Sequence, residues 1–185
     1  MNNYDREYWN RFYSDCSVKI TPSSFALFCM GFIEGGSLID IGCGNGRDSI
    51  YFAEKGLDVT AVDIADYYRN LIEFSGVRFI KQDLSKFKPE EWFDYAYCRF
   101  LFHAVPEDIE DHLLAVMPVR KMLFIEARSD KDTIDGHYRR PLNMERFITK
   151  LFGYRIIYKT EQRGLSPYEG DDPMIIRIVC ENNIT

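Results

Sequence analysis

The sequence predicts an α/β fold, in which helices cover both faces of a mostly parallel sheet that ends in an antiparallel hairpin. Three observations predict it. From about residue 23 onward, short apolar runs of strand length alternate with longer segments of helical periodicity. A glycine-rich turn joins the first apolar run to the helical segment that follows it. The last two apolar runs are joined by a turn-rich loop without a helix, as in an antiparallel pair.

The N-terminal segment, residues 3–13, places five aromatic side chains at near-helical spacing: Tyr4, Tyr8, Trp9, Phe12 and Tyr13. Two roles fit this pattern. A helix can pack its aromatic face on the body of the protein, or it can act as a lid that covers bound ligands and excludes water. We expect residues 1–20 to form this segment and residues 21–185 to form the core of a single domain, since 185 residues suffice for one hydrophobic core.

A glycine-rich turn in residues 37–46 is the most informative local pattern. An apolar run ends there at Gly42, Gly44 and Gly46, and a helical segment follows. Glycines permit positive φ and let a ligand approach the backbone closely. The helix N-terminus then offers unpaired N–H groups to a negative group. A second apolar run, residues 59–62, ends in Asp63, 21 residues after Gly42, where an acidic side chain at a strand end can bind a ribose.

The other elements follow from periodicity and from glycine and proline positions. We expect helices at residues 23–33, 46–55, 65–74, 106–116 and 143–151. We expect strands at residues 37–41, 59–63, 77–81, 92–100, 121–127, 154–159 and 174–180. Thr21 is the expected N-cap of the helix at 23–33, with Pro22 at its first position. That helix is almost wholly apolar, so we expect it to be buried.

Composition narrows the class of function. The net charge of −6 argues against a broad nucleic-acid surface, because phosphate contacts need clustered Lys and Arg. The longest apolar stretch, residues 25–33, is too short to span a membrane, and we expect no signal peptide. The five cysteines are odd in number and none are spaced as metal ligands, which predicts reduced side chains in a cytoplasmic protein.

No metal site is expected, because His103, His112 and His137 are scattered along the chain. Cys43, between two glycines, is either a small turn residue or a nucleophile.

Two families of cofactor-binding protein use such a glycine turn. The dinucleotide fingerprint would place Arg47 where a small residue must allow close helix packing. The pattern Asp-x-Gly-x-Gly-x-Gly, which starts at Asp40, instead resembles motif I of the class I S-adenosylmethionine (SAM)-dependent methyltransferases. The resemblance covers about residues 23–181. It implies a Rossmann-like sheet of seven strands, SAM as the cofactor and methyl transfer as the reaction.

The resemblance also implies roles for individual residues. Asp40 would help to hold the methionine end of SAM, Asp63 its ribose hydroxyls, and Asp83 with the Leu84 backbone its adenine amino group. The alternative for Asp83, taken alone, is a solvated loop carboxylate. The expected cofactor-binding residues are Asp40, Gly42, Cys43, Gly44, Gly46, Asp63, Ile64, Asp83, Leu84 and Arg99.

Arginines gather where the fourth and fifth strands end, at Arg99, Arg128, Arg139 and Arg140. The planar guanidinium matches phosphate and carboxylate groups, so the set indicates an anion pocket. The alternative for each arginine is an ion pair, for example with Glu126. The segments His-Tyr-Arg-Arg at 137–140 and Arg-Phe-x-x-His at 99–103, with the aromatic N-terminus, also resemble bacterial phosphate and phosphonate O-methyltransferases.

These patterns predict a SAM-dependent methyltransferase that acts on an oxygen of a small anionic metabolite, as a monomer or a homodimer. A hydroxyl acceptor would need a base, and His103 is the candidate. An ionised oxygen needs none, and His103, Arg139 and Tyr13 would then orient the anion. The expected substrate-binding residues are Tyr8, Arg128, Tyr138 and Arg140. The alternatives are a neutral, amine, thiol, tellurium or selenium acceptor, or a non-catalytic SAM-binding partner subunit.

Overall fold

The computed structural model describes residues 3–15, 21–131, 140–165 and 172–183. The protein has a seven-stranded mixed sheet with the strand order β3-β2-β1-β4-β5-β7-β6. The chain divides into two compact units, residues 1–88 and residues 89–185. No helix in the described part of the chain is long and apolar enough to cross a membrane.

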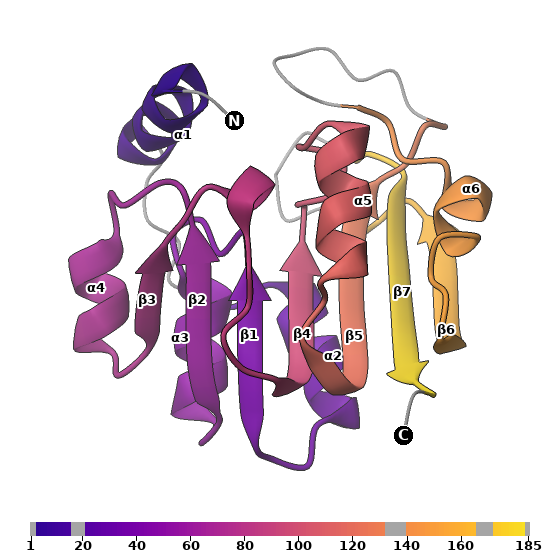
Figure 1. The fold of residues 1–185 in the computed structure, drawn as a ribbon, viewed down its shortest axis with the longest axis horizontal. Coiled ribbons are helices and arrows are strands. Elements are labelled where there is room, and N and C mark those ends of the chain that lie inside the picture. The colour runs from indigo at the N-terminus through magenta and orange to yellow at the C-terminus, as the bar shows by residue number, and fades with distance from the viewer. Residues whose placement is uncertain (1–2, 16–20, 132–139, 166–171, 184–185) are drawn as a thin grey trace. The chain divides into compact units, whose positions relative to one another are not determined.

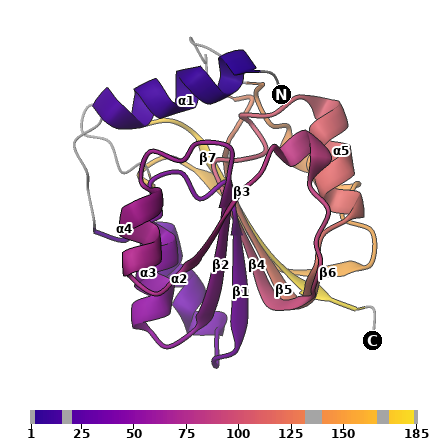
Figure 2. The same cartoon turned by 60° about the vertical axis from the view of Figure 1, so that its left-hand side comes forward.

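The first unit contains three parallel strands (Figure 1), which are β1 (Ser37–Ile41), β2 (Asp58–Asp63) and β3 (Arg78–Lys81). Its helices are α1 (Asn3–Asp15), α2 (Ser24–Cys29), α3 (Arg47–Glu54) and α4 (Arg69–Phe74), with short 3₁₀ turns at Met30–Phe32 and Leu84–Lys86. Helices α2, α3 and α4 lie on one face of the three strands (Figure 2). The strands β1 and β2 are buried almost throughout, as expected for parallel strands covered by helices.

The second unit combines a parallel and an antiparallel pair. It contains β4 (Phe93–Arg99), α5 (Glu107–Ala115), β5 (Val119–Arg128), α6 (Met144–Ile148), β6 (Tyr154–Gln162) and β7 (Ile175–Asn182). Strands β4 and β5 are parallel, and β7 is antiparallel to both β5 and β6. The last strand of the chain therefore lies between β5 and β6. This confirms the predicted terminal hairpin, and all seven predicted strands are present.

The predicted start of α2 is wrong. Ser23, and not Thr21, is the N-cap: its Oγ accepts a hydrogen bond from the Ala26 N–H at 3.0 Å. Ser23 also donates to the Asp48 carboxylate through its N–H, at 2.7 Å, and through its Oγ, at 2.8 Å. A partner 25 residues away thus fixes the cap. The helix is also less buried than expected, since Leu27 is 53% exposed.

Two other predicted helices are shorter than expected. Helix α4 begins at Arg69 and not near residue 65, because Asp63 Oδ1 accepts the Ala65 N–H at 2.8 Å and keeps the chain in a turn there. Helix α6 ends at Ile148, three residues before the predicted end. After β3 the chain forms only the 3₁₀ turn Leu84–Lys86, whose N-cap is Asp83.

Candidate active site

The glycine loop between β1 and α3 adopts the backbone conformation that its sequence predicts. Gly42, Gly44 and Gly46 have φ values of 79°, 58° and 73°, in the left-handed region that side chains disfavour. The N–H groups of Gly42 and Cys43 both donate to the Val62 carbonyl, at 2.8 and 3.2 Å. A Cβ at Gly46 would lie 2.3 Å from Ile72. The loop is therefore held against the end of β2 with no space for larger residues at Gly46.

Asp63 joins this loop to the segment that follows β2. Its Oδ2 accepts the Gly44 N–H and its Oδ1 the Ala65 N–H, each at 2.8 Å. The side chain is buried, and this burial raises the pKa of the carboxyl, while the backbone N–H groups act in the opposite direction. Each carboxylate oxygen can accept a second hydrogen bond. Asp63 is thus fixed at the strand end where the sequence analysis expects a ribose.

Asp40, the first residue of the motif, is buried and contacts the following helix. Its Oδ2 accepts a hydrogen bond of 2.5 Å from Ser49 Oγ in α3. This contact connects β1 to α3, and the predicted role of Asp40 toward SAM stays a prediction.

Cys43 has the properties of a turn residue. Burial raises the pKa of its thiol well above the usual value, and the nearby Asp63 and Asp40 raise it further. The thiol therefore stays protonated, which argues against a nucleophile. Asp83 caps the turn after β3 by accepting hydrogen bonds from the N–H and Oγ of Ser85, at 2.9 and 2.8 Å.

Helix α1 is attached to the loop between β2 and α4. The Asn10 side chain exchanges two hydrogen bonds with Asp66, at 3.3 and 3.1 Å, and the Tyr68 hydroxyl donates to the Tyr13 carbonyl at 2.9 Å. A Cβ added to Gly44 would lie 2.3 Å from the Tyr13 hydroxyl oxygen. The aromatic face of α1 therefore touches the glycine loop itself, as both predicted roles of this segment require.

In the second unit, a row of charged side chains crosses three strands. Arg99 in β4, Glu126 in β5 and Arg177 in β7 are register partners. Arg99 Nε donates to Glu126 Oε1 at 2.8 Å, and Arg177 Nε donates to Oε2 at 2.7 Å. Burial raises the pKa of Glu126, while the two guanidinium groups act in the opposite direction. Glu126 is a partner that the sequence suggests for these arginines, whereas Arg177 was not expected in this row.

Strand β4 ends in an unusual turn at Phe100, whose φ is 57°. Its N–H still donates to the Glu126 carbonyl at 2.7 Å. The Phe100 ring lies 4.3 Å from the Arg99 guanidinium carbon and 5.4 Å from the centre of the His103 ring. His103 is buried, and its Nδ1 accepts the Arg128 N–H at 3.2 Å. The residue predicted as a base is thus fixed to the end of β5.

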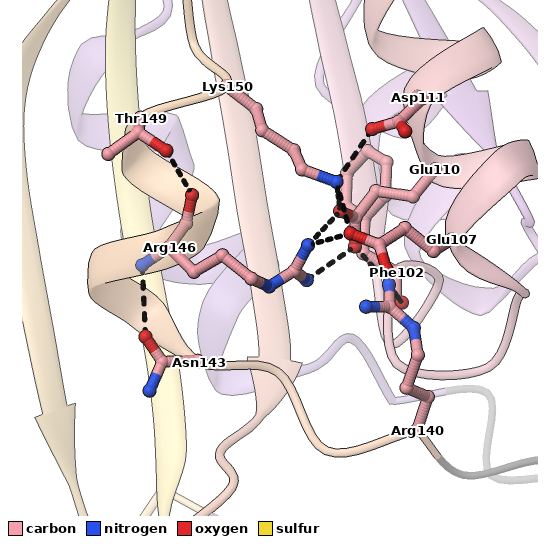
Figure 3. A network of polar contacts seen from close by, with 9 residues as sticks. All are labelled: Phe102, Glu107, Glu110, Asp111, Arg140, Asn143, Arg146, Thr149 and Lys150. Atoms are coloured by element: carbon pink, nitrogen blue, oxygen red, sulfur yellow. Dashed lines mark hydrogen bonds and ion pairs between the residues drawn. The ribbon is translucent and has the colours of Figure 1, made fainter.

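Arg140 belongs to an ion cluster that Figure 3 shows from close by. Its guanidinium pairs with Glu110, a fully buried carboxylate in α5 that also pairs with Arg146 and Lys150. The Arg140 N–H donates to the His103 carbonyl at 2.8 Å. These contacts favour the ion-pair alternative for Arg140. Its role toward a substrate stays a prediction.

Some predicted site residues have no described geometry. His137, Tyr138 and Arg139 lie outside the described residues. Arg128 is buried at the carboxyl end of β5. Among the described residues, no group of three or more His, Cys, Asp and Glu side chains could hold a metal ion.

Comparison with known proteins gives the family of the central segment. Residues 38–121 match the family model described as a methyltransferase domain. This segment is a methyltransferase domain. It contains the glycine loop, Asp63, Asp83, Arg99 and His103. The match and the fold support SAM as the cofactor and a SAM-dependent methyltransferase as the activity. None of the curated proteins compared with the chain matches it.

Solved structures show the same fold at low sequence identity. The 1,6-didemethyltoxoflavin N1-methyltransferase of Burkholderia thailandensis, with bound S-adenosylhomocysteine, has a TM-score of 0.71 and 19% identity over 97% of this chain and 84% of that chain. The magnesium protoporphyrin IX methyltransferase of Synechocystis PCC 6803 has a TM-score of 0.70 and 16% identity over 97% of this chain and 99% of that chain. A structure described by the conversion of a disulfide bond into a thioacetal group during echinomycin biosynthesis has a TM-score of 0.75 and 19% identity over 97% of this chain and 93% of that chain.

Several structural residues of this methyltransferase fold were missed by the sequence analysis. They are Asn10, Ser23, Asp48, Ser49, Asp66, Glu110 and Arg177. Ser49 had a local signal, because it lies in the first turn of a helix directly after the glycine loop. The others pair with residues far away in the sequence, and no local pattern identifies such partners.

Proposed function

We propose that this methyltransferase transfers the methyl group of SAM to an oxygen of a small anionic molecule, such as a phosphate, a phosphonate or a carboxylate. The observation that carries the proposal is the set of buried or nearly buried arginines near the carboxyl ends of β4 and β5. Arg99 is the last residue of β4, and Arg128 is the last residue of β5. Arg177, in β7, is the register partner of Glu126 in β5. Ligands of sheets of this kind bind outside the carboxyl ends of the parallel strands.

The chemistry of this arginine set favours an anion over a neutral acceptor. A guanidinium stays charged at any working pH and offers five N–H donors in a plane. Arg99 and Arg177 both contact Glu126 through Nε. Glu126 holds both side chains in place at once. Charged groups interact more strongly when water is excluded from them, so a buried arginine recognises an anion better than an exposed one does.

The described cofactor residues lie in the first unit, apart from Arg99. Positive φ at three glycines and the fixed carboxylate of Asp63 fit a ligand with a ribose and a backbone-contacting group. When bound, SAM supplies an activated methyl group. The chain's own contribution is then to hold the acceptor oxygen in line and to exclude water, and α1, whose Tyr13 lies beside Gly44, would do the latter.

A screen of acceptors tests the proposal. Purified protein and SAM are offered phosphonates, sugar phosphates and carboxylates, each beside a matched neutral alcohol or amine. On the best anionic acceptor, we expect Arg128→Gln to lower kcat/KM by roughly 10- to 100-fold, because an arginine that bonds an anion contributes about 1.5–3 kcal/mol. Lysine at the same position should restore part of this loss. Arg139→Ala should act in the same way.

The matched control is Arg155→Gln. Arg155 is an exposed arginine near the start of β6 that pairs with Glu181, at the opposite edge of the sheet from the proposed site. Affinity for S-adenosylhomocysteine is measured for every variant. An uncharged best acceptor would overturn the anionic reading and support a neutral, amine or thiol acceptor. A loss in Arg128→Gln that lies wholly in cofactor affinity would place that residue at SAM instead.

A further inference from the structure

The hydrogen bonds between β4 and β5 end in an irregular way. In a regular parallel pair, the Phe100 N–H bonds the Glu126 carbonyl and the Arg128 N–H then bonds the Phe100 carbonyl. The first of these bonds is present at 2.7 Å. The positive φ of Phe100 then turns the chain away from β5. His103 Nδ1 accepts the Arg128 N–H in place of the Phe100 carbonyl, at 3.2 Å.

This bond determines which imidazole nitrogen carries the proton. A nitrogen that accepts an N–H must have a bare lone pair, so Nδ1 is unprotonated. The remaining proton of the neutral imidazole is then on Nε2, because the bond made by one ring nitrogen sets the state of the other. In the imidazolium form, Nδ1 would also carry a proton, and two N–H donors, those of His103 and Arg128, would face each other without a hydrogen bond. The contact therefore selects the neutral Nε2–H form of His103.

We propose that His103 is a hydrogen-bond donor that positions the acceptor oxygen through Nε2–H, and that it is not a general base. A base must offer a lone pair, and here the Nδ1 lone pair is bonded to Arg128 while Nε2 already carries a proton. The ring is also fixed by its neighbours, since the His103 carbonyl accepts the Arg140 N–H at 2.8 Å and the Phe100 ring packs on the imidazole.

This inference rests on the proposed function and narrows the class of acceptor to one whose oxygen is already ionised. Both oxygens of the Glu126 carboxylate, in the row of charged side chains that crosses β4, β5 and β7, accept hydrogen bonds from arginine, so Glu126 too is a poor base. His103 and the arginines would then present donors only. Such a set suits an oxygen that is already ionised, from which no proton has to be removed. An un-ionised alcohol would need a base that this group of residues does not supply.

Two substitutions separate the two nitrogens of His103. In His103→Asn, the amide oxygen takes the place of Nδ1 and can accept the Arg128 N–H, but no donor reaches the place of Nε2. In His103→Gln, the amide nitrogen takes the place of Nε2 and can donate, but it has no basicity. His103→Ala removes both. We expect His103→Gln to stay within about 10-fold of the wild-type kcat/KM, and His103→Asn and His103→Ala to fall by roughly 10- to 100-fold. His103→Asn should keep more thermal stability than His103→Ala.

The tautomer is measured without any acceptor. A long-range ¹H–¹⁵N spectrum is recorded for the protein labelled at its histidines. The signals of His103 are those that are absent from the spectrum of His103→Gln. We expect an unprotonated Nδ1 and a protonated Nε2 at neutral pH. An Nδ1–H tautomer or an imidazolium would overturn the proposal, as would a His103→Gln variant as impaired as His103→Ala. If the best acceptor proves uncharged, the anionic function fails, while the spectrum still decides the state of His103.

Discussion

At the scale of single residues, Asp63 has a structural role, and a role in ribose binding is predicted for it. Its two oxygens hold the glycine loop and the loop after β2 through the N–H groups of Gly44 and Ala65. A carboxylate in this position is buried at a cost, because burial disfavours its charged form. A residue that served packing alone would not need the charge. We therefore expect the charge to matter most for the ligand.

The first prediction tests this charge. Asp63→Asn should weaken the binding of S-adenosylhomocysteine by roughly 10- to 100-fold, because hydrogen bonds to a charged group contribute about 1.5–3 kcal/mol. Isothermal titration calorimetry gives the affinity. Asp58→Asn, at the exposed start of the same strand, is the matched control and should bind as the wild type does. Binding of a nicotinamide dinucleotide in place of the SAM product would contradict the assignment of the loop.

The second prediction follows from the raised pKa of Asp63. Between the usual value of 3.8 and the higher folded value, the folded state binds more protons than the unfolded state. Stability contributed by this group therefore falls as the pH rises through that window. Asp63→Asn lacks this dependence. We expect the free energy of unfolding of the variant, minus that of the wild type, to increase with pH in the acid range. Urea titrations at several pH values measure it, and a flat difference would refute it.

The residues whose local geometry was predicted correctly are those with a local signal. The three glycines and Asp63 were found because spacing along the chain fixes their places in a strand–turn–helix unit, and their geometry is as expected. The row formed by Arg99, Glu126 and Arg177 was predicted only in part. Arg177 lies 51 residues from Glu126, and only the register of β7 against β5 brings them together. The periodicity of a sequence indicates which face of a helix or strand is buried, but it does not indicate which distant strands pair.

At the scale of elements, α1 and the glycine loop constrain each other. Gly44 has a φ of 58°, and the space beside it is filled by the Tyr13 hydroxyl. The third prediction is that Gly44→Ala lowers the free energy of unfolding by at least about 1–2 kcal/mol, the cost of a left-handed conformation for an L-residue. Denaturant titration measures this loss.

Two further variants separate the causes of this loss. In the double variant Tyr13→Ala/Gly44→Ala, the clash with Tyr13 is gone and only the conformational cost remains, so the coupling energy should be clearly non-zero. Gly31→Ala is the control, because its φ is ordinary and nothing lies within 4 Å of its Cβ position. A coupling energy near zero would mean that α1 does not lie on the loop in solution.

The fourth prediction concerns the ion cluster that connects α5 to α6 (Figure 3). Glu110 is fully buried, and Arg140, Arg146 and Lys150 surround it. Glu110→Gln should lower the free energy of unfolding by about 2–3 kcal/mol, because it removes the charge that three cations share. Asp111→Asn is the matched control in the same helix. Asp111 is exposed and pairs only with Lys150 among the described ion pairs, so its loss should cost under about 1 kcal/mol.

Helix starts and ends show the same limit of local signals as the paired residues do. Thr21 and Pro22 form a good start signal, yet α2 begins later because Asp48 binds Ser23. Likewise, the helix predicted from residue 65 starts at Arg69, since Asp63 and Asn10 hold the intervening turn. In both cases a contact with a distant part of the chain overrode a local preference. Strands were predicted more accurately, because their buried apolar runs are short and sharply bounded.

At the scale of the whole molecule, the expected functions are divided along the chain. The glycine loop, Asp63 and Asp83 belong to residues 1–88, whereas Arg99, His103, Arg128 and Arg177 belong to residues 89–185. A methyltransferase that uses both sets needs them to act as one body. The single domain that the sequence predicts has a thermodynamic consequence. In a single cooperative domain, any ligand that stabilises one part stabilises every strand equally.

The last prediction applies this to hydrogen exchange. S-adenosylhomocysteine at 100 times its Kd should raise the free energy of global opening by about 2.7 kcal/mol. The slowest-exchanging amides of β2, in the first unit, and of β7, in the second, report that opening in each unit. We expect both strands to gain protection by the same amount, although the described cofactor residues apart from Arg99 lie in the first unit. Asp63→Asn is the control, in which both gains should shrink together. Protection gained in β2 alone would mean that the two units open independently, and the single-domain expectation would then be wrong.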